Sequence, residues 1–286
     1  MVVSLQGKDV VVTGATDGIG KVTARELARL GAKVTLIGRS AAKGDSVVRD
    51  LRAVTGKDDI HFVRGDLSSR KGVQHVADSL KERLKHLDVL VNNAGAIFQK
   101  RIMSEDGIEQ TLALNHLGYF SLTALLVDLL KAAGTARIVN VASAAHLGAR
   151  IDLDDLQNAK RYSGWTAYGQ SKLANIYFTY ELARRLDGSG VSVNCLHPGF
   201  VASAFGNNNG GWLRVAIGLA KSVGAISQDN GAMTSVYLAS APEVEGVSGQ
   251  YFDKCKAVKS SPISYDEDIA RKLWSASERL SGLTFK

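Results

Sequence analysis

Six short runs rich in valine and isoleucine recur along the chain and alternate with longer segments that have helical periodicity. Each short run predicts a strand buried on both faces, because a strand covered on two sides carries few polar residues. Intervening segments such as KVTARELARLGA place apolar residues at helical spacing. This alternation predicts βαβ crossovers, and therefore an α/β fold with a doubly wound parallel sheet of Rossmann type. The predicted strands are 9–13, 33–38, 60–65, 88–93, 137–143 and 191–197.

The domain organisation follows from the continuity of this pattern. The 286 residues contain no linker, low-complexity run or internal repeat, so we expect a single dinucleotide-binding oxidoreductase domain over 1–286. Residues 203–226, with the stretch GNNNGG, interrupt the alternation after the last predicted strand. Because ligands bind outside the carboxyl ends of parallel strands, we expect 203–226 to form a substrate lid. A variable surface loop is the alternative.

Charge and cysteine content narrow the class of partner. The formal net charge of +7 favours anionic partners, such as a phosphorylated cofactor. Lysine and arginine are scattered without a long basic run, which argues against nucleic acid. The two cysteines, Cys195 and Cys255, lie in no CxxC or Cys/His cluster. We therefore expect neither a disulfide framework nor a metal site, and a reducing compartment fits.

Targeting signals and membrane spans are not evident in the sequence. The N-terminus runs almost at once into a strand pattern, which leaves no room for a signal peptide, and we expect a cytoplasmic protein. The apolar stretch 212–226 is broken by Arg214 and Lys221 and is too short to span a bilayer. We expect no transmembrane segment, and at most a weak contact of 212–226 with a membrane surface.

A glycine-rich turn follows the first predicted strand. In TGATDGIGK, Gly14, Gly18 and Gly20 lie where the strand must turn into a helix. Glycines let the backbone approach a pyrophosphate, and a helix N-terminus offers free N–H groups to it. The triphosphate P-loop is excluded, because Ala15 replaces its first glycine and Val22 its Ser or Thr. The spacing also differs from G-x-G-x-x-G, but its position after the first strand predicts a dinucleotide site.

The end of the second predicted strand bears on the choice of dinucleotide. It reads Gly38 and Arg39, without a carboxylate, and Lys43 follows closely. An acid at this place would bind the ribose 2′-OH of NAD, whereas an arginine suits the 2′-phosphate of NADP. We therefore predict NADP as the cofactor. Asp17 in the glycine turn argues in the other direction, since a carboxylate near that phosphate would repel it, and NAD stays the alternative.

Tyr168 and Lys172 in TAYGQSKLAN are four residues apart. If this stretch is helical, the two side chains lie on the same face, one turn apart. That spacing is equally compatible with an exposed helix surface and with an active site. The rest of the chain has to decide between the two interpretations.

The order of motifs along the chain resembles that of short-chain dehydrogenases/reductases, and the resemblance covers essentially the whole chain. The residues 249–283 further resemble the retinol dehydrogenase branch of that family. This chain departs from the usual pattern at Ala142, where relatives often have serine, and at Ser203, where threonine is more usual. The motifs are TGATDGIG, GDL at 65–67, DVLVNNAG, ALNHLG around Asn115, IVNVASAAH around Ser143, YGQSK and HPGFVAS.

The resemblance implies a catalytic tetrad of Asn115, Ser143, Tyr168 and Lys172. Hydride transfer to a carbonyl places negative charge on its oxygen, so a proton donor and a hydrogen-bond donor must point at that atom. In the implied roles, Tyr168 gives the proton and Ser143 holds the oxygen. Lys172 favours the phenolate and holds the nicotinamide ribose, and Asn115 orders a water that relays the proton.

The resemblance also implies a set of cofactor contacts along the carboxyl edge of the sheet. The glycine turn would hold the pyrophosphate, and residues after the later strands would meet the adenine, the ribose and the nicotinamide. The implied contacts are Gly14, Asp17, Gly18, Ile19, Gly20, Arg39, Asp66, Leu67, Asn93, Ala94, Gly95, Tyr168, Lys172, Pro198, Gly199, Val201 and Ser203.

Five further residues invite a functional interpretation with a plain structural alternative. His146 is a candidate for substrate contact, and the alternative is a solvated polar residue at a strand end. Trp165 and Phe205 are candidates for lining an apolar pocket, with core packing as the alternative. We interpret His197 and Cys195 as structural.

The sequence thus predicts an NADP(H)-dependent oxidoreductase that interconverts an alcohol and a carbonyl. If the branch resemblance holds, its small-molecule substrate is a lipophilic aldehyde or ketone. An NAD-dependent alcohol dehydrogenase of the same fold and a non-catalytic dinucleotide sensor are the alternatives. The sequence does not determine the oligomeric state, although homo-oligomers are frequent in the family.

Overall fold

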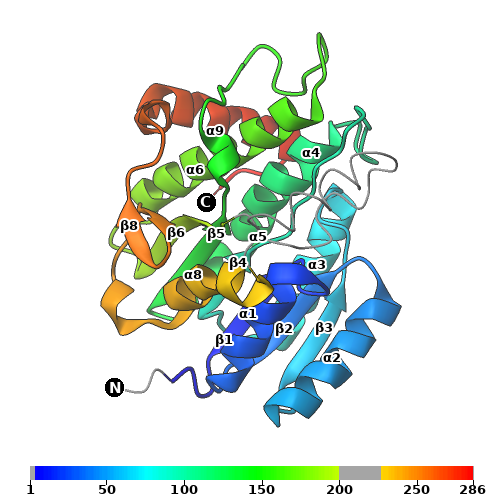
Figure 1. The fold of residues 1–286 in the computed structure, drawn as a ribbon, viewed down its shortest axis with the longest axis vertical. Coiled ribbons are helices and arrows are strands. Elements are labelled where there is room, and N and C mark those ends of the chain that lie inside the picture. The colour runs from blue at the N-terminus through cyan, green and yellow to red at the C-terminus, as the bar shows by residue number, and fades with distance from the viewer. Residues whose placement is uncertain (1–3, 200–226, 286) are drawn as a thin grey trace.

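The computed structural model describes residues 4–199 and 227–285, which build one eight-stranded sheet with helices on both faces (Figure 1). The strand order is β3-β2-β1-β4-β5-β6-β7-β8. The first seven strands in this order pair in parallel. The last strand, β8, pairs antiparallel with β7. This is the predicted doubly wound α/β fold of Rossmann type. The strands are β1 Asp9–Thr13, β2 Lys33–Gly38, β3 Ile60–Arg64, β4 Val89–Asn92, β5 Ala136–Val141, β6 Val191–His197, β7 Tyr251–Asp253 and β8 Lys256–Val258.

All six predicted strands are present, but the prediction that each is buried on both faces is wrong for β3. This strand lies at one edge of the sheet, where Arg64 is exposed and His61 and Phe62 are only partly buried. Strands β7 and β8 were not predicted. Each has three residues, and β8 is exposed throughout, so neither carries an apolar run that marks a strand.

The helices begin and end at residues that favour these positions. Side chains of Ser40, Ser69 and Ser163 cap three N-termini, and Gly56 and Gly282 end two helices in the left-handed conformation. The helices are α1 Gly18–Arg29, α2 Ala41–Thr55, α3 Arg70–Arg83, α4 Gln110–Leu112, α5 Gly118–Ala132, α6 Gly164–Arg185, α8 Gln228–Ser240 and α9 Glu267–Ser281, with the π-helix η1 Ala113–Leu117 and the 3-10 helices η2 Ala144–His146, η3 Pro242–Val244 and η4 Pro262–Tyr265.

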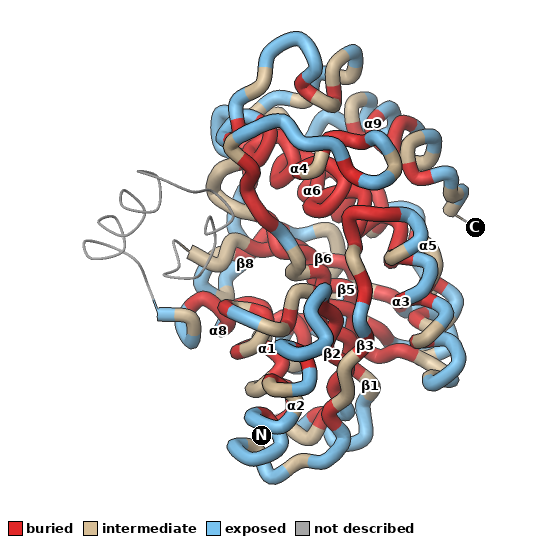
Figure 2. Tube along the Cα trace, turned by 90° about the vertical axis from the view of Figure 1, so that its right-hand side faces the viewer, coloured by how far each residue is buried: buried red, intermediate tan, exposed pale blue. Residues whose placement is uncertain are grey.

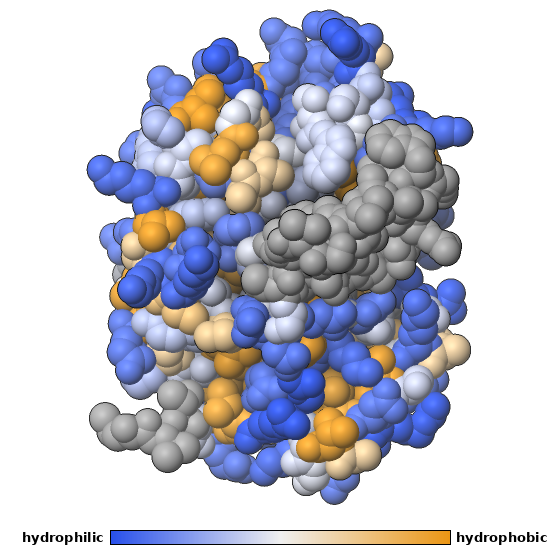
Figure 3. All heavy atoms as spheres, viewed as in Figure 1, coloured by the Kyte–Doolittle hydropathy of each residue, from blue (hydrophilic) through white to orange (hydrophobic). Residues whose placement is uncertain are grey.

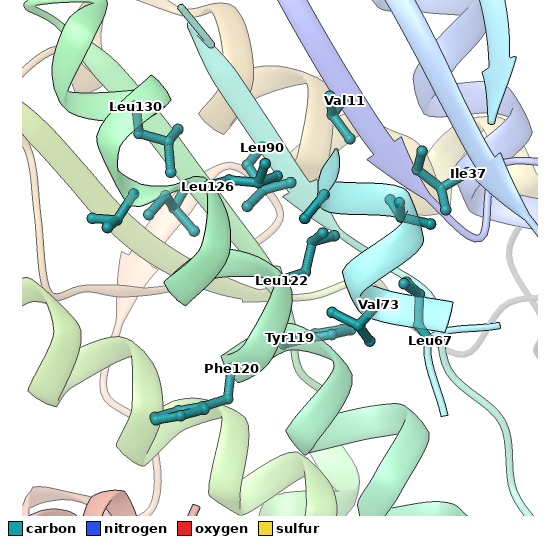
Figure 4. Close-up of a cluster of buried hydrophobic side chains, with 14 of the residues drawn as sticks. Val11, Ile37, Leu67, Val73, Leu90, Tyr119, Phe120, Leu122, Leu126 and Leu130 are labelled. Atoms are coloured by element: carbon teal, nitrogen blue, oxygen red, sulfur yellow. The ribbon is translucent and has the colours of Figure 1, made fainter. Parts of the chain in front are cut away.

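Alternate strand residues point into two separate cores. In β1, Val11 packs on the side of α3, α5 and α6, whereas Val10 and Val12 pack on the side of α1, α2 and α8. Figure 4 shows the first core, where Leu122 and Leu126 of α5 face the sheet. In Figure 2 the strands form the buried centre, and exposed residues line the outer sides of the helices. The two cores hold the strands in register and thereby fix where each strand ends.

The most apolar helical run is Gln110–Ala132, with a mean hydropathy of 1.3 over its most apolar window. It is the one helix among residues 4–199 and 227–285 that is long and apolar enough to cross a membrane. However, 78% of that window is buried inside the protein. Core packing thus accounts for its apolarity. On the face shown in Figure 3, hydrophobic side chains are interspersed among hydrophilic ones. The predicted lid, 203–226, and the proposed membrane contact, 212–226, lie outside the described residues.

Candidate active site

The predicted site residues gather at the carboxyl edge of the sheet. The strand order reverses between β1 and β4, and in open α/β sheets such a switch point opens a crevice for a ligand. Pro198 and Gly199 follow β6 at this edge, with Gly199 at φ +81°. The predicted contacts Val201 and Ser203 lie outside the described residues.

In the glycine turn between β1 and α1, Gly14 and Gly20 lie where a side chain would not fit. Gly14 and Gly18 have φ of +64° and +56°, which L-residues rarely adopt. A Cβ added to Gly20 would lie 2.4 Å from the carbonyl oxygen of Gly14 and 2.5 Å from Nδ2 of Asn93. Helix α1 begins at Gly18, and Ile19 stands in its first turn. The turn therefore offers backbone N–H groups at a helix N-terminus, as an anion site requires.

Asp17 has a structural task in this turn. Its carboxylate caps α1 and accepts a hydrogen bond of 2.7 Å from the backbone N–H of Gly18. Capping of α1 therefore explains an acid at position 17 without reference to the choice between NAD and NADP.

Thr13 joins the glycine turn to the end of β4, and sequence reasoning missed it. Its hydroxyl accepts hydrogen bonds from the backbone N–H groups of Asn93 (2.8 Å) and Ala94 (3.0 Å). Asn93 Nδ2 in turn donates to the carbonyl oxygen of Thr13 at 2.8 Å. The predicted contacts Asn93 and Ala94 thus lie directly against the turn. A threonine ending the first strand, before the glycines, is the signal that could have pointed to this role.

The ends of β2 and β3 place a basic corner beside the turn. Arg39 directly follows β2 and is exposed, and its carbonyl oxygen accepts from Nε of Arg64 at 3.2 Å. Asp66, after β3, is occupied by its own loop, since its Oδ1 accepts from the N–H and the hydroxyl of Ser68. Leu67 is buried in the core. Of these predicted contacts, Arg39 offers an accessible charged group.

Asn115 lies in the π-helix Ala113–Leu117, a distortion that often marks functional sites. Its side-chain Oδ1 accepts from the N–H of Ala96, and its Nδ2 donates to the oxygen of Ala96 and to the hydroxyl of Ser171. Its backbone oxygen accepts from Nδ2 of Asn175 at 2.9 Å. The side chain of Asn115 therefore ties the loop after β4 to Ser171 in α6.

A buried polar chain ties Asn115 to the last helix. His116 contacts Oδ1 of Asn175 through Nδ1 at 3.4 Å and the hydroxyl of Ser277 in α9 through Nε2 at 2.8 Å. Burial lowers the pKa of His116 to about 4, so its ring is neutral. Sequence reasoning missed His116, Asn175 and Ser277, since nothing in the local pattern marks them as neighbours.

Lys172 is buried beside Tyr168, one helical turn away on α6. Its Nζ donates to the oxygen of Val141 at 2.8 Å and lies 5.7 Å from the ring centre of Tyr168. A second ring, that of Tyr119, has its centre 5.6 Å from Nζ, and its buried hydroxyl lacks a hydrogen-bond partner among the described residues. A Cβ added to Gly95 would lie 3.4 Å from Nζ. The end of β4 and the Tyr168–Lys172 pair are thus adjacent.

Burial controls the ionisation of the pair. It raises the pKa of Tyr168 to about 12, and a hydrogen bond with Ser143 opposes this rise. Burial also lowers the pKa of Lys172 to about 7. The phenol therefore keeps its proton at neutral pH, while the lysine is poised between its two states. The pair is buried and does not form an exposed helix surface.

His146 is buried and His197 is partly buried, and both rings contact the backbone around Ser143. The alternative that His146 is a solvated residue at a strand end is wrong, because its Nδ1 lies 2.7 Å from the oxygen of Ser143 and its Nε2 accepts from the N–H of Ser261 at 3.1 Å. His197 accepts from the N–H of Ala144 through Nδ1 at 3.1 Å. The two rings therefore support the turn that carries Ser143.

The predictions for Trp165 and Cys195 can be compared with their positions in the structure. Trp165 is 52% exposed and lines an open groove of about 660 Å³ beside the first turn of α6, so core packing does not describe it. Phe205 lies outside the described residues. Cys195 is buried in β6, as expected for a structural residue.

One cluster in the described residues has side chains of the kind that bind metals. Asp9, His86 and Asp88 come together at the amino ends of β1 and β4, on the edge opposite the glycine turn. Asp88 is already engaged, since its carboxylate accepts from Nζ of Lys8 and from the N–H of Asp9, each at 2.8 Å. Lys8 and Asp88 thus form an ion pair within this group at the far edge of the sheet.

Comparison with known proteins gives a consistent assignment. The family model described as short chain dehydrogenase matches residues 8–213. Human retinol dehydrogenase 13 is 42% identical over 98% of this chain and 86% of its own length. Human retinol dehydrogenase 11 is 43% identical over 98% of this chain and 88% of its own length.

Solved structures agree with the sequence relatives. An uncharacterized protein from Mycobacterium paratuberculosis is 34% identical and superposes with a TM-score of 0.81 over 100% of this chain and 97% of its own. The Pseudomonas aeruginosa RhlG/NADP active-site complex is 29% identical, with a TM-score of 0.69 over 87% of this chain and 95% of its own. The chain therefore belongs to the short-chain dehydrogenase/reductase family, in its retinol dehydrogenase-like branch, and is an oxidoreductase of the alcohol/carbonyl type.

Proposed function

We propose that the protein is an NADP(H)-dependent oxidoreductase that interconverts a lipophilic aldehyde or ketone and the corresponding alcohol. The meeting of Tyr168, Lys172 and Ser143 beside the glycine turn carries this proposal. These three residues come from α6 and from the end of β5, and the fold brings them to one place. A phenol, an ammonium and a hydroxyl at one point suit the protonation of a developing alkoxide.

The ionisation of the site favours reduction at neutral pH. In reduction, Tyr168 gives its proton to the carbonyl oxygen and Ser143 donates a hydrogen bond to the same atom. Burial keeps the phenol protonated, with a pKa of about 12 for Tyr168, which is the form that reduction needs. Oxidation of an alcohol needs the phenolate, and thus a higher pH or a positive charge close by, such as a protonated Lys172.

The residues at the edge of the sheet fit a nicotinamide dinucleotide. The glycine turn is tight enough that a Cβ at Gly20 would fill it, which suits close approach of a pyrophosphate. Within the described residues, Nζ of Lys172 donates to a single acceptor, the oxygen of Val141, so donors are left for ribose hydroxyls. When bound, such a cofactor supplies the hydride for reduction or accepts it in oxidation.

A preference for NADP follows from the basic corner after β2. Arg39 directly follows β2, at the position where an acid would favour NAD. Lys43 is exposed four residues further along the chain, and the exposed Arg64 is paired in register with Gly38 in the neighbouring strand β3. An arginine can bind a 2′-phosphate through two charge-assisted hydrogen bonds. The 29% identical neighbour was solved with NADP, which supports the same preference here.

The proposed substrate class comes from the relatives. Proteins about 42% identical over nearly the whole chain are named retinol dehydrogenases. A retinoid is a long apolar molecule that ends in an alcohol or aldehyde. Retinoids and other lipophilic carbonyl compounds are therefore the first candidates for this enzyme.

A cofactor and substrate panel tests this function. NADPH or NADH oxidation is followed by absorbance with all-trans-retinal, aliphatic aldehydes, aromatic aldehydes and ketones. We expect turnover of at least one lipophilic carbonyl, with a higher kcat/KM for NADPH than for NADH. Absence of turnover across the panel with both cofactors would refute the proposal.

An arginine variant tests the cofactor preference separately. Loss of one charge-assisted hydrogen bond costs about 1.5–3 kcal/mol, so Arg39→Leu should weaken NADPH binding by about 10- to 100-fold and leave NADH binding nearly unchanged. Fluorescence titration of each cofactor measures this. Arg49→Leu, on the exposed side of α2, is the matched control. Equal losses for both cofactors in Arg39→Leu would argue against a 2′-phosphate contact.

A further inference from the structure

A single peptide group, which joins Ser143 to Ala144, is held on both of its polar atoms by imidazole rings. His146 Nδ1 lies 2.7 Å from its oxygen, and His197 Nδ1 accepts from its N–H at 3.1 Å. The backbone N–H of His146 donates to the same oxygen at 3.1 Å. The hydroxyl of Ser143 accepts from the N–H of Ala145 at 3.1 Å. The rotation of this peptide plane is therefore set by two histidines.

The donors around each ring fix its tautomer. Because the N–H of Ser261 points at Nε2 of His146, that nitrogen must be bare, and the proton sits on Nδ1 and is donated to Ser143. Because Nδ1 of His197 accepts from Ala144, its proton sits on Nε2. Burial lowers the pKa of both rings, which keeps them neutral and able to accept.

Both rings are in turn supported by the C-terminal part of the chain. The ring of His146 packs against Tyr251 of β7 at 5.1 Å, and His197 is paired in register with Asp253 of the same strand. Figure 1 shows this end of the sheet, where β7 lies between β6 and β8 in the strand order. The segment that includes Ser261 is held in place by further bonds, among them one of 2.7 Å between the hydroxyls of Tyr180 and Ser260.

The orientation of this peptide plane affects where the side chain of Ser143 points. The dihedral angle ψ, the rotation about the Cα–C bond of Ser143, sets the angle between the plane and the Cα–Cβ bond. Ser143 has an extended backbone with φ −165° and ψ 155°, so fixing the plane fixes ψ and with it the direction of the Cα–Cβ bond. We propose that His146 and His197 form a clamp on the Ser143–Ala144 peptide and act as positioning residues for the Ser143 hydroxyl. This rests on the proposed function, in which Ser143 holds the reacting oxygen.

Substitutions at His197 test one side of the clamp. In His197→Asn, the side-chain oxygen can take the place of Nδ1 and accept from Ala144, whereas His197→Leu removes the acceptor. We expect His197→Leu to lower kcat about tenfold with KM values for NADPH and carbonyl within about threefold of wild type. His197→Asn should restore most of kcat.

A matched pair at His146 tests the other side. His146→Asn keeps a donor at the position of Nδ1 and loses the acceptor for Ser261, and His146→Gln does the reverse. Both variants lose the ring packing on Tyr251, so both should have a lower melting temperature. If the clamp orients Ser143, His146→Gln should lower kcat about tenfold and His146→Asn should stay within about threefold. His75→Gln, on the exposed side of α3, is the control for a histidine change as such.

The assay uses full-length protein, NADPH and the best carbonyl of the panel, with rates normalised to cofactor-binding sites so that unfolded protein does not count. Ser143→Ala separates the two proposals. If Ser143→Ala turns over like wild type, the role of Ser143 in the proposed function fails. If Ser143→Ala is impaired but the paired variants at His146 and at His197 show no difference in kcat within each pair, the clamp is overturned. The expected asymmetry in both pairs supports it.

Discussion

The two halves of the carboxyl edge are built in different ways. At β1 and β4, backbone meets backbone, and Gly14 and Gly20 lie so close to the end of β4 that a Cβ on Gly20 would overlap Asn93. At β5 and β6, buried side chains meet, and Ser143, Tyr168 and Lys172 keep their places through hydrogen bonds and packing. The first half leaves no room for an added atom, whereas the second half depends on individual polar atoms.

This difference predicts opposite sensitivities. Substitutions that add atoms should damage the glycine half, since close-packed backbone cannot relax. Substitutions that delete a single polar atom should damage the half around Tyr168, because each buried polar group there has few partners.

The largest effect on turnover is expected from deleting one oxygen atom in the half of the edge around Tyr168. Tyr168→Phe removes the proposed proton donor and should lower kcat by about 10²- to 10⁴-fold, while the NADPH dissociation constant stays close to that of wild type. Steady-state kinetics and fluorescence titration measure the two quantities. Tyr237→Phe in α8, on the other face of the sheet, is the control and should have normal kcat. A Tyr168→Phe enzyme with wild-type turnover would contradict the assigned role.

The glycine half should fail on addition of one methyl group. In Gly20→Ala, the new Cβ would collide with the oxygen of Gly14 and with Nδ2 of Asn93, so we expect a loss of about 1–3 kcal/mol in the free energy of unfolding. The displaced turn should also weaken NADPH binding by at least about tenfold. Urea denaturation and cofactor titration measure the two effects.

The control for Gly20→Ala is Gly188→Ala, a glycine substitution that introduces backbone strain but no steric clash. Gly188 has φ +73° and nothing within 4 Å of an added Cβ. Gly188→Ala should therefore cost about 1–2 kcal/mol and leave cofactor binding unchanged. Equal cofactor binding in Gly20→Ala and wild type would mean that the turn does not hold the pyrophosphate.

The same contrast explains what the sequence could reveal. The glycine half was predicted from contiguous residues, because a strand followed by glycines and a helix has local causes. The second half became visible only through family resemblance, which supplied Ser143 and Asn115. Its supporting contacts stayed hidden, since His146 meets Ser261 across 115 residues of chain and no local pattern encodes that meeting. The short strands β7 and β8 escaped notice for a related reason, since β7 is placed by pairing with β6 and β8 by pairing with β7.

Deleting a polar atom in the glycine half should affect stability alone, without the loss of cofactor binding expected for Gly20→Ala. Thr13→Val keeps the shape of the side chain but leaves the N–H groups of Asn93 and Ala94 without their acceptor, so unfolding should become easier by about 1–3 kcal/mol. Thr13→Ser keeps the hydroxyl and is the matched control. Urea denaturation compares the two. If Thr13→Val and Thr13→Ser are equally stable, the hydroxyl does not join the turn to β4, and the glycine half depends on close packing alone.

The smallest effect concerns the charge of Lys172 and appears as a slope in pH. Burial lowers its pKa from 10.5 to about 7, so between these values the unfolded chain binds one proton more than the folded protein. The free energy of unfolding should therefore rise with pH in this window, by at most about 1.4 kcal/mol per pH unit, and Lys172→Met should lack this contribution.

Urea denaturation of both proteins without cofactor at pH 7.5 and 9 measures the difference in slope. Tyr168 does not interfere in that range, because its raised pKa affects stability only above the ordinary tyrosine value near 10. If the two slopes are the same, Lys172 is protonated in the folded protein across this range. Its ammonium would then have a stabilising partner beyond the oxygen of Val141, and the half of the edge around Tyr168 would be organised by charge rather than by burial.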